Sequence, residues 1–193
     1  EHELDETSLI CLYGIGAVVS AEIVLKAGEM DIPIVFALPW QQTVSVLNPL
    51  RTSRSHVREQ QILRRNDPDV MRTGMAMLAA KLGNQASVLK YFARYRKNAD
   101  AVLYAQLTEA AEQVRDQAQS LKALDPSTAG ARASAMGHEG HGASIYWSTL
   151  AKLMPQSVEF TARRTRLASD SVNQTINYVY GLLYGEVWRA LAK

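Results

Sequence analysis

The chain has 193 residues and a formal net charge of +2, with 47% hydrophobic and 21% charged residues. This length and composition are those of a globular protein with one domain, or two small ones, around a real core. No apolar run approaches the ~18 residues of a membrane-spanning helix, and the single cysteine, Cys11, excludes an intrachain disulfide. We therefore expect a protein of the reducing cytoplasm that does not enter a membrane.

Charge is unevenly distributed along the chain. Residues 1–50 hold seven acidic and one basic side chain, residues 51–97 hold eleven basic and three acidic ones, and residues 98–193 hold nine of each. An arginine-rich basic block over 51–97 is typical of a surface that binds the phosphate backbone of nucleic acid. The alternative is an ordinary solvated helix face, and charge alone does not decide between the two.

The first 48 residues mix strand and helix patterns. Short apolar runs predict strands, over 8–13, 17–19, 32–37 and 43–47. Ser20 is expected to cap a helix over 21–29, because its hydroxyl accepts a hydrogen bond from the first helical turn. These strands are too few for a complete sheet domain, so we expect further strands before Glu1.

From residue 55 onward the pattern is helical. The predicted helices cover 57–66, 68–97, 98–124, 127–154 and 170–193. Asp67-Pro68 opens the second helix, and Gly83-Asn84 is a candidate break within it. Three polar residues are expected to cap the later helices, Asn98, Ser127 and Ser169. In the last helix, an apolar seam is predicted to be buried, formed by Val172, Ile176, Val179, Leu183 and Val187.

The predicted fold class is α+β and mostly α. We expect the remnant of an N-terminal β-rich domain over 1–48, a linker over 49–56 and a C-terminal all-helical domain over 57–193. The chain begins without Met and stops inside a helical pattern, so we interpret it as a fragment cut at both ends.

Glu139 has an unusual setting. Gly137, Gly140 and Gly142 surround it inside a predicted helix, where each glycine costs roughly 1 kcal/mol relative to alanine. We interpret this cost as a sign that the backbone approaches something closely. Helical spacing places Glu139 at the polar end of an aromatic face, with Ala143, Tyr146, Trp147 and Leu150. A half-buried carboxylate is a natural ligand for a hard divalent cation; the alternative is a solvated glutamate beside glycines that only allow tight helix packing.

His138 and His141 flank Glu139 and are three residues apart, which permits shared metal ligation. Their spacing is not the His-Glu-x-x-His pattern of zinc peptidases, and no cysteine pair completes a structural zinc site. Two surface or capping histidines are therefore the favoured interpretation.

Further polar and aromatic residues follow. Arg163, Arg164 and Arg166 precede the start of the last helix, where guanidinium groups and helix amides both favour anions; ordinary surface charge is the alternative. Along the last helix, a stripe of polar and aromatic residues is expected to line either an interface or a cleft. It consists of Asn173, Asn177, Tyr180, Tyr184 and Trp188.

These motifs occur in a fixed order: Gly137-x-Glu139-Gly140-x-x-Ala143-x-x-Tyr146-Trp147, Phe160-x-x-Arg163, Asp170-x-x-Asn173 and Tyr178-x-Tyr180-Gly181-Leu182-Leu183-Tyr184-Gly185-Glu186. In order, gaps and helical placement they resemble the CRISPR-associated endonuclease and integrase of spacer acquisition, the first-numbered Cas protein. The resemblance is most specific from Gly137 to Lys193 and extends more loosely to the start of the chain.

The resemblance implies a metal-dependent DNA endonuclease and integrase that inserts foreign DNA spacers into a CRISPR array, in antiviral defence. Glu139 matches the family's catalytic metal-binding Glu, with Mg²⁺ or Mn²⁺ as the cofactor. The family's metal-binding His and Asp are expected beyond Lys193, so this fragment alone is expected to be inactive. The implied partners are double-stranded DNA (spacer precursor and CRISPR repeat), a second copy in a homodimer and the second-numbered Cas protein.

Other site residues are also predicted. Arg163, by resemblance, and Arg58, Arg64 and Arg65, by charge, are expected to contact DNA phosphates. The resemblance places three further residues near the cleft, Asp170, Asn173 and Tyr184. The main alternative is a non-catalytic DNA-binding or dimerisation subunit without a complete metal site, and a third hypothesis is a helical protein-interaction module.

Overall fold

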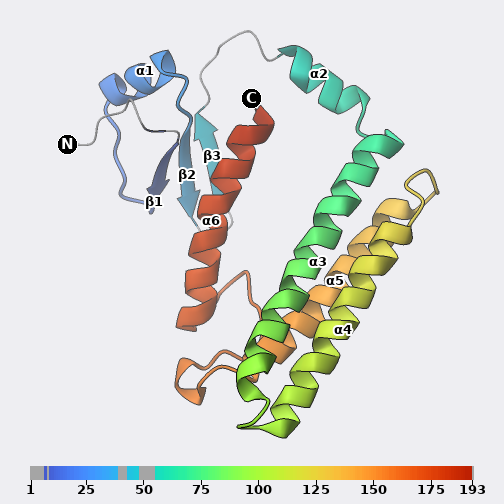
Figure 1. Cartoon of the computed structure of the whole chain (residues 1–193). Helices are drawn as coiled ribbons and strands as arrows, with labels where there is room; N and C mark the ends of the chain where they lie inside the picture. The colour runs from blue at the N-terminus through green and yellow to red at the C-terminus, as the bar shows by residue number, and fades with distance from the viewer. Residues whose placement is uncertain (1–6, 8, 39–42, 48–54, 193) are drawn as a thin grey trace. The chain divides into compact units, whose positions relative to one another are not determined.

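The computed structural model describes residues 7, 9–38, 43–47 and 55–192. Spatial contacts divide the chain into two compact units, one formed by Glu1–Ile62 with Arg164–Lys193 and the other by Leu63–Arg163. The fold is α+β and mostly α, as predicted (Figure 1). None of the described helices is both long and apolar enough to cross a bilayer. The predicted division into 1–48, 49–56 and 57–193 stays a prediction, and most of its linker lies outside the described residues.

The first unit contains a three-stranded sheet in the order β1-β2-β3. Its elements are β1 (Ile10–Tyr13), α1 (Ala21–Glu29), β2 (Ile34–Leu38), β3 (Thr43–Leu47), α2 (Ser55–Leu63) and α6 (Ser171–Ala192). β1 pairs in parallel with β2, with Ile10 opposite Ile34, and β2 pairs antiparallel with β3, with Ile34 opposite Leu47. Parallel neighbours require a crossover, which the α1 segment provides.

Alternate side chains of β1 pack against two different helices, as the period of two in a strand requires. Ile10 and Leu12 belong to the cluster that includes Val24 and Ala27 of α1. The intervening side chains meet α6 instead, at Gly181 and Gly185. A Cβ on Gly185 would lie 2.6 Å from Leu9 Cδ2, and one on Gly181 would lie 3.4 Å from the Tyr13 hydroxyl. The sheet therefore has α1 on one face and the glycine face of α6 on the other.

Two predictions in this unit are wrong. Residues 17–19 lie in no strand. The apolar seam of α6 is half-buried at Val172 and Ile176, but Val179, Leu183 and Val187 are 55%, 54% and 48% exposed. The reason is that α6 turns its glycine face toward β1, and at 100° per residue the seam lies on the opposite side of the helix. The Ser20 cap is confirmed, since its hydroxyl accepts from the Ile23 amide at 3.3 Å.

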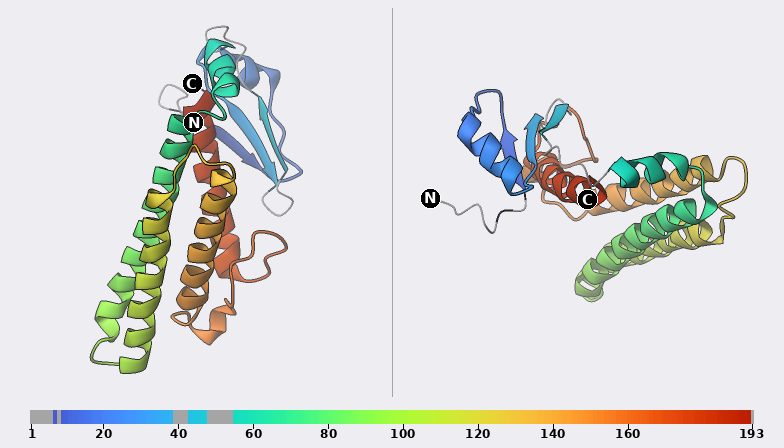
Figure 2. Two further views of the ribbon diagram at one scale, coloured as in Figure 1. Left: turned by 90° about the vertical axis from the view of Figure 1, so that its right-hand side faces the viewer. Right: turned by 90° about the horizontal axis from the view of Figure 1, so that it is seen from above.

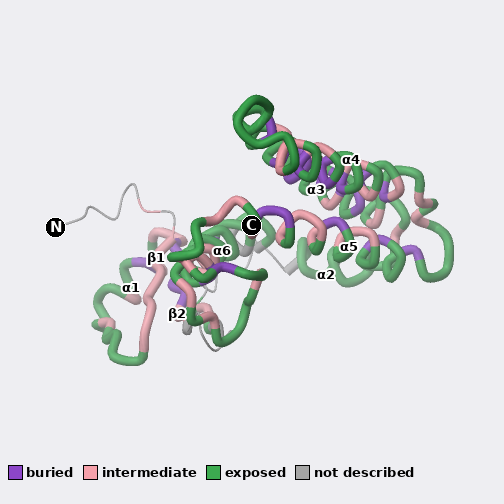
Figure 3. The backbone as a smooth tube through the Cα atoms, turned by 90° about the horizontal axis from the view of Figure 1, so that it is seen from below, coloured by how far each residue is buried: buried purple, intermediate pink, exposed green. Residues whose placement is uncertain are grey.

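The second unit consists of three long helices that pack side by side, α3 (Pro68–Arg96), α4 (Ala101–Ala123) and α5 (Ala131–Ala151), followed by the short 3-10 helix η3 (Gln156–Val158). Figure 2 shows them from two further sides. Their core is rich in leucine and alanine at three- and four-residue spacing, for example Leu82, Ala86, Leu89, Leu107, Ala111, Val114 and Leu121. Figure 3 shows these buried stretches recurring along the helices between exposed ones.

The ends of these helices differ from the predictions by up to four residues. Asp67 and Pro68 open α3 as predicted, and Asp67 accepts from the Asp69 amide at 2.8 Å. Asp100 rather than Asn98 caps α4, accepting from Leu103 N at 2.9 Å. No side chain caps α5, which follows Gly130 at φ 85°; Ser127 instead bonds Asp125 in the preceding turn. Asp170 rather than Ser169 accepts from the first turn of α6.

The candidate break at Gly83-Asn84 does not occur, because α3 continues through both residues. Leu82 and Ala86 on either side are fully buried. Their packing against α4 and α5 outweighs the roughly 1 kcal/mol that a mid-helix glycine costs.

Gly142 lets α5 approach its neighbours. A Cβ at this position would lie 2.8 Å from Leu82 Cδ2 and 3.4 Å from Gln117 Cβ, whereas a Cβ at Gly137 or Gly140 would meet nothing within 4 Å. The interpretation that all three glycines mark a close approach is therefore correct only for Gly142.

This contrast predicts opposite effects of one substitution at two glycines. Gly140→Ala is expected to stabilise the chain by up to about 1 kcal/mol through helix propensity. Gly142→Ala is expected to lower the free energy of unfolding, because overpacking against the buried Leu82 costs about 1–3 kcal/mol. Urea unfolding followed by circular dichroism measures both. Equal stability of the two variants would contradict the close contact at Gly142.

Candidate functional site

Glu139 lies midway along α5 and is half-buried, with a side chain that is 14% exposed. Its carboxylate forms an ion pair with the ammonium group of Lys81 on α3, and the Lys81 side chain is 42% exposed. The same turn of α3 carries Leu82, which packs against Gly142. The close contact between the two helices therefore brings the carboxylate of one to the cation of the other.

Gln85 lies one turn along α3 from Lys81, on the same side of the helix. The residue is 8% exposed, and its amide oxygen has no hydrogen-bond partner among the described residues. An unpaired buried acceptor is costly. It is an oxygen donor of the kind that a hard divalent cation takes.

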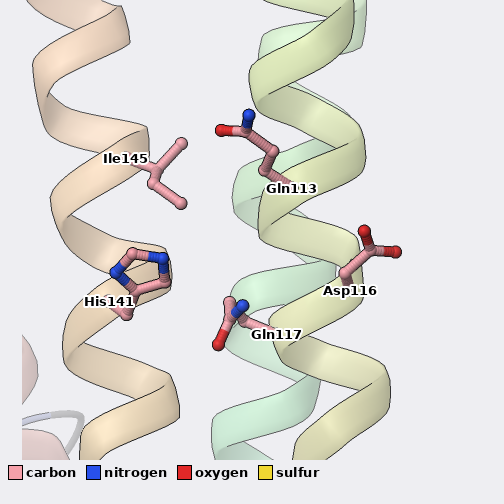
Figure 4. Close-up of a pocket in the computed structure, with 5 residues that line it drawn as sticks. All are labelled: Gln113, Asp116, Gln117, His141 and Ile145. Atoms are coloured by element: carbon pink, nitrogen blue, oxygen red, sulfur yellow. The ribbon is translucent and has the colours of Figure 1, made fainter.

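The two histidines lie on another side of α5. His138 Nδ1 is 2.8 Å from Gln117 Oε1 of α4. His141 lines an open cavity of about 460 Å³ with Gln113, Asp116, Gln117 and Ile145. Figure 4 shows the His141 ring and Ile145 on α5 facing α4, with the Asp116 carboxylate directed away from the ring. Since Glu139 and His141 are two residues apart, they point about 200° apart around the helix and do not share a ligand.

Among the described residues, no three His, Cys, Asp or Glu side chains come together as a metal-binding group. Glu139 is the carboxylate of the predicted metal site, and its present partner is a cation. A half-buried carboxylate with a cationic partner fits one corner of a divalent-cation site rather than a whole one.

Aromatic rings follow Glu139 toward the end of α5. The centroids of Tyr146 and Trp147 are 4.8 Å apart, and those of Trp147 and Phe160 are 6.3 Å apart, both edge to face. The Arg163 guanidinium carbon lies 5.8 Å from the centroid of the Trp147 ring, a cation–π contact. This contact holds the predicted phosphate ligand against the bundle.

Asp170 and Asn173 form the start of α6 in the first unit. Asn173 is fully buried and accepts from the Arg164 amide at 2.9 Å. Asp170 accepts from the Asn173 amide at 2.7 Å and from its side chain at 2.8 Å, and these hydrogen bonds lower the pKa of Asp170. Both residues thus fasten the 164–170 segment to α6, so their local role is structural.

The remaining predicted residues lie on the surface. Arg58 and Arg65 are exposed. Arg64 forms an ion pair with Asp67 at 2.8 Å, and this partner's pKa is lowered chiefly by the hydrogen bond from Arg64. Tyr184 is 55% exposed. The side chain of Trp188, the last member of the predicted stripe, lies outside the described residues.

Gln85 is one site residue that the sequence did not predict, and Lys81 is another. Its partner Glu139 is 58 residues away in the chain, and no local spacing signals a contact over that separation. The sequence carried only a weak sign of this role: a lysine directly before Leu82 in an alanine-rich stretch of the predicted helix.

The buried network at α6 predicts a loss of stability in Asn173→Ala. This change leaves the Arg164 amide without its acceptor and removes a side-chain donor from Asp170, so we expect a loss of roughly 1–3 kcal/mol in the free energy of unfolding. Gln174→Ala is the matched control, because Gln174 is exposed in the same turn and is expected to change stability by less than about 0.5 kcal/mol.

The pH dependence gives a second measurement on the same variant. The folded pKa of Asp170 is below its usual value of 3.8, so the carboxylate stabilises the fold above that pH and this contribution is lost as pH falls through the folded pKa. The difference in stability between the original chain and Asn173→Ala should therefore shrink below pH 3.8. A difference that stays constant on acidification would contradict the role of Asp170.

Comparison with known proteins identifies relatives along the whole chain. Residues 1–193 match the family described as CRISPR associated protein Cas1. The CRISPR-associated endonuclease Cas1 of Korarchaeum cryptofilum (strain OPF8) is 29% identical over 182 residues, which are 90% of this chain and 52% of that protein. The CRISPR-associated endonuclease Cas1 1 of Pyrobaculum aerophilum is 34% identical over 109 residues, 56% of this chain and 32% of that protein.

A solved structure shares the fold. The casposase bound to integration product superimposes with a TM-score of 0.69 at 18% identity, over 96% of this chain and 49% of that one. The chain spans about half the length of the relative from Korarchaeum and of this structure. The family predicted from the motifs is confirmed by the match over the full chain: the chain belongs to the CRISPR-associated protein Cas1 family.

Proposed function

We propose that this chain is part of a metal-dependent DNA endonuclease and integrase that inserts spacers into a CRISPR array. The observation that carries the proposal is the half-buried Glu139 with its cationic partner Lys81, in a chain of the Cas1 family. The relative from Korarchaeum is named an endonuclease, and the casposase structure contains an integration product.

Integration is a transesterification in which a DNA 3′ hydroxyl attacks a phosphodiester. A bound Mg²⁺ or Mn²⁺ would offset the negative charge that develops on the phosphate and help to ionise the attacking hydroxyl. Glu139 would hold that ion through its carboxylate, and Gln85 is a second oxygen on the facing helix. The family resemblance assigns the other two ligands to a His and an Asp that do not lie within these 193 residues.

Lys81 has two roles in this proposal. Without a metal, its ammonium group balances the charge of Glu139, which would otherwise be half-buried without a counter-ion. If Glu139 held a divalent cation, the Lys81 ammonium group would no longer be needed as its counter-ion and would remain close to the site. A lysine there is a suitable partner for a DNA phosphate.

The basic block is the proposed surface for duplex DNA. Arg58 and Arg65 are exposed, whereas Arg64 is held by Asp67. Phosphate contacts of this kind position DNA without selecting its sequence, as a protein that captures DNA of arbitrary sequence requires. A homodimer, the second-numbered Cas protein and a cytoplasmic location complete the proposal and follow from the family resemblance.

The first test is Glu139→Ala in a full-length protein of this family that contains these 193 residues. With branched DNA and Mn²⁺ or Mg²⁺, we expect cleavage and strand joining to fall at least about 100-fold, because the metal loses a charged ligand. Glu112→Ala is the matched control, since Glu112 also pairs with a lysine of α3, Lys90, at 2.5 Å, and should keep its activity. Undiminished joining by Glu139→Ala would contradict the metal role.

The second test measures DNA affinity against salt concentration. Arg65→Gln is expected to weaken duplex binding equally for all sequences and to reduce the slope of log affinity against log salt by about 1. Arg132→Gln is the control, because Arg132 is exposed outside the basic block. An unchanged slope in Arg65→Gln would remove Arg65 from the DNA surface.

A second candidate is a non-catalytic DNA-binding or dimerisation subunit; both hypotheses expect the described residues to contain no three-ligand metal group. The coding sequence downstream of Lys193 separates the two hypotheses. A His and then an Asp after the last helix support the enzyme, and their absence supports the non-catalytic subunit.

A further inference from the structure

The C-terminal end of α3 carries three exposed aromatic rings that the proposed catalytic site does not use. Tyr91, Phe92 and Tyr95 are 53%, 38% and 65% exposed. They lie on one side of the helix because residues three and four apart are neighbours on its surface, and we call them the aromatic face. Large exposed rings gathered in one place are typical of a binding surface.

The geometry of the aromatic face leaves its rings unstacked. Tyr91 and Phe92 have centroids 5.5 Å apart at 78°, and Tyr91 and Tyr95 have centroids 5.1 Å apart at 67°. The Tyr95 hydroxyl lies 3.3 Å from that of Tyr91, which links the two rings. In these edge-to-face pairs no ring is stacked face to face on another, and each of the three residues keeps a third or more of its surface exposed.

The surroundings of the aromatic face are basic. Residues 88–99 contain four basic side chains and no acidic one. Lys90 is paired with Glu112. The other three, Arg94, Arg96 and Lys97, are exposed, and none forms a salt bridge within the described part of the chain.

We propose that the aromatic face binds single-stranded DNA, with bases stacked on Tyr91 and Tyr95 and phosphates held by Arg94, Arg96 and Lys97. Stacking on exposed aromatic rings beside free cations is a general mode of single-strand binding that tolerates any sequence. A duplex hides its base faces and would use the cations alone. Interfaces between proteins also collect aromatic and arginine side chains; the absence of any acidic residue among the four basic ones over 88–99 is what favours a polyanion here.

The inference rests on the proposed function only in naming DNA rather than RNA as the ligand. It extends that function, because integration requires a strand end that is not paired. The aromatic face lies near the end of α3 and Glu139 lies midway along α5, so substitutions test the two sites separately.

The experiment compares binding of a fluorescent oligo-dT strand and of a blunt duplex of equal length to this chain. The double variant Tyr91→Ala/Tyr95→Ala is expected to bind oligo-dT about 10-fold or more weakly, since each stacked base contributes substantially to affinity, and to bind the duplex nearly as before. Tyr91→Phe/Tyr95→Phe keeps both rings and should keep the affinity. Met77→Ala is the matched control, because Met77 is 70% exposed on the same helix and carries no ring.

Three results would overturn the inference: oligo-dT affinity unchanged in the alanine variant, an equal loss for strand and duplex, or an equal loss in the phenylalanine variant. Sedimentation of the alanine variant adds a further outcome. A changed oligomeric state with unchanged oligo-dT binding would make the aromatic face an interface between copies. All the altered side chains are exposed, so the variants are expected to fold, which circular dichroism checks.

Glu139→Ala separates this inference from the proposed function. In the Glu139→Ala background, oligo-dT binding should still fall when Tyr91 and Tyr95 are replaced by alanine. If joining activity is absent in every form of the protein but oligo-dT binding still depends on Tyr91 and Tyr95, the inference stands and the proposed function fails. If joining depends on Glu139 but oligo-dT affinity is unchanged when both tyrosines are replaced, only the inference fails.

Discussion

The packing of α5 on α3 at Gly142 is the contact on which the candidate site depends. A missing Cβ at this position brings the α5 backbone against the buried Leu82. Glu139 is one turn before Gly142, and Lys81 directly precedes Leu82, so the contact that closes the core also fixes the register of the ion pair. A shift of one residue along either helix would turn its side chain about 100° away and separate the two charges.

The ion pair of Lys81 and Glu139 is more buried than another ion pair of α3, which Lys90 forms with Glu112. Lys90 and Glu112 are joined across α3 and α4, but their side chains are 36% and 50% exposed, and a pair in that setting contributes little to stability. The Glu139 side chain is 14% exposed, so water compensates its charge less and a cation has to do so. Any cation close to the carboxylate meets this need for charge compensation. The packing therefore preserves a carboxylate that needs a cationic partner, which is Lys81 in this structure and a divalent ion in the proposed function.

The sequence predicted features that depend on local periodicity and missed those that depend on distant partners. The helices α3, α4 and α5 follow from apolar spacing and from Asp67-Pro68, because these signals act within one or two turns. The uncapped start of α5 at Gly130 and the unbroken α3 at Gly83 depend on packing between helices. The apolar seam of α6 was predicted with the correct helical period, but the sheet packs against the opposite face of α6, which carries the glycines. Lys81 was missed for the same reason, since its role exists only once α3 meets α5.

The proposed aromatic face and the carboxylate site share one rigid element. Lys81, Val88 and Tyr95 are seven residues apart and so lie within about 20° of one another per step around α3. From Lys81 to Tyr91 and Tyr95 the helix rises about 15 and 21 Å. Since α3 has no break between these positions, a strand held on the rings would keep a fixed distance from Glu139. In the proposed integration reaction, which joins DNA of arbitrary sequence, a fixed distance would allow the protein to select its substrate by length and shape.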